Sequence, residues 1–212
     1  MLKLCIVNSK KYKMKKLFLI LIGFLLVNCT SNDPDPIVVA NCISTNTNFQ
    51  QLYNPLNTSS FPENLSGFSN SVTHEYTFMV TNAATICSVG YQSQAALSTQ
   101  NYQIEIYDVV TSSVVASVTS TFSATTTSYV SLPTPFVLIA GRSYKIKRNS
   151  PATVASPNGA GRCVSNTVSG AGNVSFPKTN GNLTITDSDF YSNSVNSGDN
   201  NNSLPFIDIV FQ

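Results

Sequence analysis

Residues 102–107 read Tyr-Gln-Ile-Glu-Ile-Tyr, and apolar and polar side chains alternate strictly along them. A period of two places successive side chains on opposite faces of a β-strand. We therefore expect Tyr102, Ile104 and Ile106 to face a core, and the three intervening and following residues to face outwards. Apolar residues at 109–110 and 114–118 then flank a polar Thr-Ser-Ser, a pattern typical of a β-hairpin.

Short segments of the same kind recur on both sides of this stretch. Residues 72–80 alternate, with Tyr76, Phe78 and Val80 on one face. Further strands are expected at 84–91, 129–132, 136–139, 143–148, 163–164, 173–176, 183–186 and 206–211. Pro133 and Pro135 are expected to separate two of them.

We find no sustained helical periodicity after Cys29. Some ten short strands separated by turn residues indicate an all-β protein. The sequence therefore predicts a single antiparallel β-sandwich over residues 42–212.

The segment from Tyr102 to Arg148 also carries a longer pattern. It reads Tyr-x-Ile-x-Ile-Tyr-Asp, then Val-Val-Ala-Ser, then Pro-Phe-x-Leu-x-Ala-Gly-x-Ser-Tyr-x-Ile. This pattern resembles secreted jelly-roll-like β-sandwich modules of unknown function. The resemblance implies a jelly-roll-like sandwich and implies no particular activity.

The N-terminal region reads as an export signal. Met14 is followed by two lysines and an unbroken apolar run over 17–27, so residues 1–28 are expected to be a signal peptide, with Met14 as a possible true start. Leu-Val-Asn-Cys at 26–29 and the acidic tether that follows, within 29–41, resemble Bacteroidota-type surface lipoproteins. The resemblance implies a lipid on Cys29 and an outer-membrane location, with display at the cell surface.

Charge excludes one class of function. Six of the twelve basic residues precede Cys29 and all ten acidic residues follow it. The chain after Cys29 is therefore acidic overall, and a nucleic-acid partner is not expected. Cys42, Cys87 and Cys163 allow one disulfide in any of three pairings.

Catalytic and metal chemistry have little support. His74 is the only histidine and lies in phase with Tyr76, so we expect a structural histidine inside the sandwich. The sequence does not indicate a pair of carboxylates suited to glycoside hydrolysis, and we expect that the protein is not an enzyme. Asp187 and Asp189, in a polar segment, could offer oxygen ligands to calcium.

Glycan binding is the preferred functional hypothesis. A sugar site needs an aromatic platform beside polar side chains that pair with hydroxyl groups. Tyr107, beside Gln103 and Glu105, is one candidate platform, and Tyr91 and Tyr191 are two others. The alternative is a structural or interaction subunit of an outer-membrane complex, or an adhesin, with a flat apolar patch.

Lys145 and Lys147 share a face and form part of the one basic cluster after Cys29. Lysines on an exposed edge strand discourage pairing with other chains. We therefore expect these two residues to protect an edge strand.

Overall fold

The computed structural model describes residues 41–64, 73–150, 161–166, 173–192, 195–196 and 201–212. The predicted signal peptide over 1–28, Cys29 and all but the last residue of the predicted tether over 29–41 lie outside these residues. All of the described residues belong to one compact unit, Ala40–Gln212. No helix among the described residues is long and apolar enough to cross a membrane.

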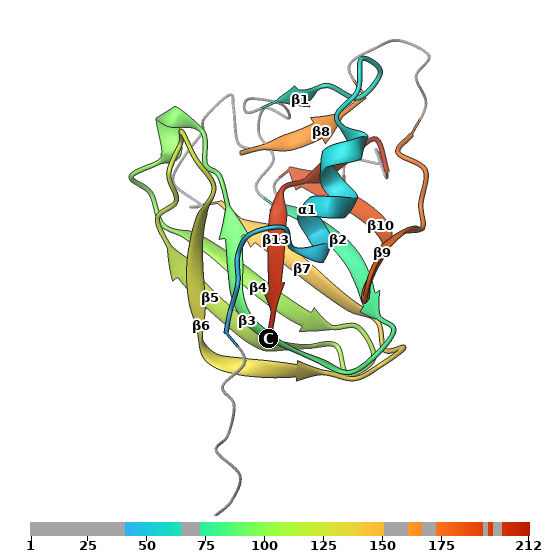
Figure 1. Cartoon of the computed structure of the whole chain (residues 1–212). Helices are drawn as coiled ribbons and strands as arrows, with labels where there is room; N and C mark the ends of the chain where they lie inside the picture. Colours follow the sequence, from blue (N-terminus) through green and yellow to red (C-terminus); the bar gives the residue numbers. More distant parts are fainter. Residues whose placement is uncertain (1–40, 65–72, 151–160, 167–172, 193–194, 197–200) are drawn as a thin grey trace, which may run out of the picture. The chain divides into compact units, whose positions relative to one another are not determined.

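Strands account for most of the regular secondary structure of the unit (Figure 1). Its helical elements are the α-helix α1 (Asn48–Tyr53) and the 3-10 turns η1 (Asn54–Leu56) and η2 (Ala95–Leu97). The strands are β1 (Glu63–Asn64), β2 (Thr73–Val80), β3 (Ala84–Tyr91), β4 (Tyr102–Asp108), β5 (Ser113–Ser120), β6 (Ser128–Leu138), β7 (Tyr144–Asn149), β8 (Cys163–Ser165), β9 (Lys178–Asn180), β10 (Leu183–Ser192), β11 (Val195–Asn196), β12 (Ser203–Pro205) and β13 (Ile207–Phe211).

The strands form antiparallel sheets that pack against each other, so the predicted all-β sandwich is confirmed. The larger sheet has the order β11-β10-β2-β7-β4-β5, and β9 pairs with β10. A second sheet has the order β13-β3-β6, and a small third sheet has the order β1-β8-β12. The central pairings, β10–β2, β2–β7 and β7–β4, join strands that are far apart in sequence, so long-range pairing decides the composition of this sheet.

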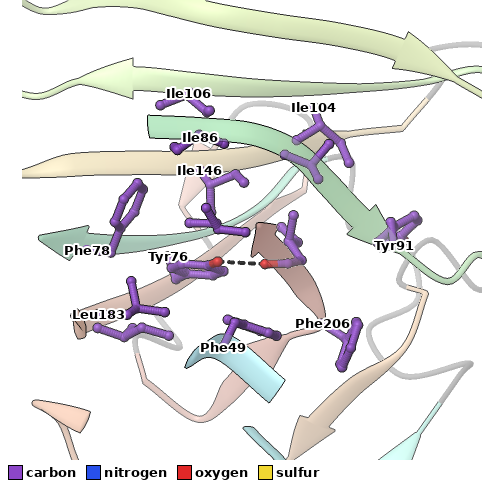
Figure 2. Close-up of a cluster of buried hydrophobic side chains, with 14 of the residues drawn as sticks. Phe49, Tyr76, Phe78, Ile86, Tyr91, Ile104, Ile106, Ile146, Leu183 and Phe206 are labelled. Atoms are coloured by element: carbon purple, nitrogen blue, oxygen red, sulfur yellow. Dashed lines mark hydrogen bonds between the residues drawn. The ribbon is translucent and has the colours of Figure 1, made fainter. Parts of the chain in front are cut away.

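The core lies between the larger sheet and the β13-β3-β6 sheet (Figure 2). Tyr76, Ile104 and Ile146 point into it from the larger sheet, and Ile86 comes from β3. The Tyr76 hydroxyl donates a hydrogen bond of 2.6 Å to the carbonyl of Ile207, at the start of β13. This bond satisfies a buried phenol and joins the two layers.

Helix α1 is a difference from the sequence prediction. Thr47 caps its N-terminus by accepting a hydrogen bond from the Gln50 backbone N–H. Phe49 is fully buried, stacks on Tyr53 and Tyr76, and meets Phe206 edge-on. Six residues are too few for helical periodicity to be recognised, and tertiary packing of these aromatic rings stabilises the helix.

Strand β6 corrects a second prediction. It runs without interruption through Pro133 and Pro135, which were expected to separate two strands. β6 lies at the edge of its sheet, and its pairing with β3 shifts register between Ile86 and Ser88. An edge position and a bulge are the places where a strand tolerates a residue without a backbone N–H. The strand expected over 173–176 is absent, and β9 begins at Lys178 instead.

The cysteine pairing is resolved among the three alternatives. Cys42 and Cys87 form a disulfide with their Cα atoms 6.0 Å apart. Cys163 is a buried free thiol, and burial raises its pKa to about 12. The disulfide fixes the segment before α1 to β3.

Candidate functional site

One outer face of the larger sheet gathers polar side chains from four adjacent strands, β10, β2, β7 and β4. Directly paired residues share a face of a sheet, so the register defines three rows across it. In strand order the rows are Tyr191, Thr73, Asn149 and Gln103; then Asp189, Glu75, Lys147 and Glu105; then Asp187, Thr77, Lys145 and Tyr107. We call this surface the polar face.

Glu75 lies at the centre of the polar face and is only 2% exposed. Its carboxylate accepts a hydrogen bond of 2.6 Å from the Lys145 ammonium, and Lys147 lies 3.5 Å away. The Tyr191 hydroxyl donates to the same carboxylate over 3.2 Å. These partners compensate the burial of the charge, so the centre of the face is held in one arrangement.

Asp189 is the neighbour of Glu75 across the β10–β2 pairing. Its Oδ1 is buried and has no hydrogen-bond partner among the described residues. Burial raises the pKa of Asp189 to about 6, and the nearby charges of Asp187 and Glu75 add to the rise. Negative charge on this side of the face therefore depends on pH in the mildly acidic range.

Tyr107 lies at the other side of the face with its side chain half-buried. The Lys147 ammonium sits 4.7 Å from the centroid of the phenol ring. Glu105 accepts a hydrogen bond of 3.0 Å from the Asn149 amide, whose oxygen accepts one from Thr73. The ring and the amide are therefore oriented by their neighbours.

The structure brings together six of the seven ligand candidates suggested by the sequence. Gln103, Glu105 and Tyr107 come from β4, and Asp187, Asp189 and Tyr191 come from β10. Strands β2 and β7 separate β4 from β10 in the sheet. The side chains form two groups at opposite sides of the polar face, and Glu75 with its partners Lys145 and Lys147 lies between them.

Tyr91 was predicted as an exposed platform, and this prediction is wrong. The residue is 1% exposed, and its hydroxyl accepts a hydrogen bond of 2.9 Å from the backbone of Gly161. Its ring packs edge-on against Tyr102 and Phe122. β3 is buried along most of its length on both faces, so alternation could not identify an exposed side there.

His74 lies inside the sandwich, as expected. It is 1% exposed, and its Nε2 lies 3.1 Å from the Ser203 hydroxyl. Burial, with a smaller contribution from the positive charge of Arg148, lowers its pKa well below the usual value. The imidazole is therefore neutral at physiological pH.

The two aspartates proposed as calcium ligands lie within strand β10, not in a turn. They alternate with Ser188 and so project from the same face. No group of three or more His, Cys, Asp or Glu side chains in the described part of the chain is arranged to hold a metal ion.

Sequence reasoning missed the residues that hold the polar face together. Lys145 and Lys147 were expected to protect an edge strand, but β7 lies between β2 and β4. Their role is to pair with Glu75 across the sheet. Alternation showed that Lys145 and Lys147 share a face, but only the strand order reveals that this face adjoins Glu75.

Comparison with known proteins identifies no relative: no protein-family model matches the chain, and no curated protein matches it. The fold and the polar face therefore define the class of this protein only as an all-β sandwich with a polar sheet surface.

Proposed function

We propose that this protein is a non-enzymatic, lipid-anchored envelope protein whose sandwich binds a glycan, or a similar extracellular polymer, on the polar face. The observation that carries the proposal is that Tyr107, Gln103, Glu105 and Tyr191 all lie on one face of one sheet. Tyr191 lies on β10 and the other three lie on β4, so a ligand that contacts both groups must extend across β2 and β7.

The chemistry of the polar face suits sugar hydroxyl groups. Each hydroxyl both donates and accepts hydrogen bonds, and the face mixes acceptors such as Glu105 with donors such as Lys145 and the side-chain amides. Tyr107 supplies an aromatic ring for the apolar side of a sugar. Carboxylates outnumber ammonium groups by four to two across the three rows. The preferred ligand is therefore a neutral or amino sugar polymer, because an acidic polymer would be repelled.

A glycan array on residues 40–212 tests this function, with and without calcium. Binding to one neutral glycan class should be lost on Tyr107→Ala and retained on Tyr107→Phe, which keeps the ring. Thr134→Ala on the exposed surface of β6 is the matched control and should bind like the parent. A blank array with folded protein, or equal binding by the Tyr107 variants, contradicts the proposal.

The anchoring part of the proposal rests on Cys29 and has its own test. Cys29→Ala should move the protein from the membrane fraction to the soluble fraction. Protease treatment of intact cells should degrade the parent protein if it is displayed on the outer surface. A Cys29→Ala protein that stays with the membrane would contradict lipid attachment at this residue.

A second candidate is an interaction subunit or adhesin, and exposed apolar side chains favour it. Val110 is 69% exposed in the β4–β5 turn, and Val137 and Ile139 are 59% and 54% exposed around the end of β6. The backbone of Val109 bonds to Ser143, close to the β6–β7 turn, so these side chains gather towards one end of the sandwich. A photo-cross-linking residue placed at Val110 or Ile139 should capture a partner protein in native membranes. The same residue placed at Thr134 is the control and should capture none.

A further inference from the structure

A pocket of about 310 Å³ lies away from the polar face. It is lined by side chains from several separate parts of the chain, among them Ser44, Asn54, Thr127, Tyr129, Arg162 and Phe206. We name it the Arg162 pocket. Its volume is equivalent to ~10 water molecules and lies at the small end of the range for ligand sites.

Two residues that line the Arg162 pocket, Gln50 and Tyr129, are hydrogen-bonded to one buried carboxylate. Asp208 is fully buried and accepts hydrogen bonds of 2.7 Å from Thr47, 2.8 Å from Gln50 and 2.7 Å from Tyr129. The Gln50 amide also donates to the carbonyl of Ser44 over 2.8 Å. Gln50 and Tyr129, which both line the pocket, are therefore held in place without a ligand.

Two further contacts fix Tyr129 and the segment that carries Ser44. The ring of Tyr129 passes over Gly90, where a Cβ atom would lie 2.3 Å from ring atom Cε1, so only glycine permits this approach. The disulfide at Cys42 ties the segment that carries Ser44 to β3. A site organised in this way loses little conformational entropy when it binds.

Arg162 is the only charged residue among the described residues that line the pocket. Its guanidinium lies 4.1 Å from the centroid of Phe206, and its Nε donates to Glu63 over 2.6 Å. Its Nη1 donates to the Thr127 hydroxyl over 3.2 Å. The guanidinium is thus oriented by three neighbours, and the adjacent Glu63 neutralises its charge.

Unused hydrogen-bonding groups complete the lining. The side chains of Ser44, Thr45 and Asn54 make no hydrogen bond within the described residues, and all three line the pocket. Hydroxyl and amide groups donate as well as accept. Glu63 balances the charge of Arg162, and Asp208 is bonded to Gln50 and Tyr129, so the surroundings carry no net positive charge and do not favour an anion.

We propose that the Arg162 pocket binds a single neutral, hydroxyl-rich ring, such as one sugar residue. The hydroxyl groups of a sugar both donate and accept, and they match the mixture of donors and acceptors that line the pocket. This site is separate from the polar face and does not depend on glycan binding there. A chain end or free sugar would occupy the pocket.

The full chain, purified in mild detergent, is titrated with methyl glycosides of glucose, galactose, mannose and N-acetylglucosamine, each up to about 20 mM, the range of weak sugar affinities. Isotope-edited spectra should show shifts at the amides of Ser44 and Thr45 and at the Arg162 side chain with at least one glycoside. Asn54→Ala should weaken that binding ~tenfold, as expected when a ligand hydroxyl loses a partner. Tyr107→Ala should leave it unchanged.

Asn54 is exposed and its side chain makes no bond in the described structure, so this variant should fold like the parent. Arg162→Lys, which loses the planar fork, is a second probe, and its melting temperature shows whether it folds. The proposal is overturned if no glycoside shifts these signals or if the shifts map to Tyr107 instead. Stronger binding of glucuronate than of the neutral sugars would also overturn it.

Discussion

Replacing Asp189 with Asn should stabilise the protein at neutral pH and have little effect in acid. Asp189 is buried beside two other carboxylates, and its pKa rises from 3.8 to about 6 in the folded protein. The folded state therefore holds the Asp189 proton more tightly than the unfolded state. The resulting stability is complete below about pH 4 and is lost as the pH rises to about 6.

A rise of this size corresponds to ~3 kcal/mol of unfolding free energy at neutral pH. Water reaches part of the polar face, so screening should reduce the measured effect to about 1–3 kcal/mol. Asparagine has nearly the same shape as aspartate but carries no charge. Asp189→Asn should therefore gain this amount at about pH 7.5 and almost nothing at about pH 3.5.

Urea denaturation of parent and variant at both pH values measures the difference directly. The chain has no tryptophan, so far-ultraviolet circular dichroism should follow unfolding. Glu105→Gln is the control, because it removes one negative charge from the same face at a half-buried position, where the glutamine oxygen can still accept the hydrogen bond from Asn149. Equal stabilisation of Asp189→Asn at both pH values, or a loss of stability at about pH 7.5, would refute the reasoning.

Three further predictions concern stability. Cys42→Ala removes a disulfide that joins residues 45 positions apart, and should lower the unfolding free energy by about 4 kcal/mol. If denaturant titration gives the variant the same unfolding free energy as the parent, the Cys42–Cys87 pairing is wrong. Phe49→Ala should lower the unfolding free energy, measured by calorimetry, by about 3–5 kcal/mol, because the ring is fully buried. Val110→Ala, at a 69% exposed position, should lower it by less than about 0.5 kcal/mol. Gly141 has a φ of 70° with open space around it, so Gly141→Ala should cost only about 1–2 kcal/mol from backbone strain, and a larger loss would indicate an unseen contact.

Local alternation predicted the faces of individual strands well. Tyr102, Ile104 and Ile106 are all buried, as expected from residues 102–107. Tyr76 and Phe78 are likewise buried on the predicted face of β2. These predictions succeeded because each strand has one buried face and one polar face, and a period of two reports that difference directly.

The same signal failed where the environment of a strand did not follow from its own residues. Tyr91 lies on a strand that is buried on both sides, so its burial depends on what covers β3. Pro133 and Pro135 lie within β6 because that strand is at a sheet edge, which the proline positions alone do not show. The six residues of α1 give too short a pattern to reveal a helix.

Patterns within single strands were enough to predict the all-β class, the inward and outward faces of β2 and β4, the β4–β5 hairpin and the structural setting of His74. The strand order, the Cys42–Cys87 pairing, and the assembly of the polar face and of the Arg162 pocket depend on how the whole chain folds. The physical reason is that side-chain alternation is a property of one strand. Strand pairing, disulfide bonding and pocket lining instead join residues that are many positions apart, and the whole core selects among these contacts.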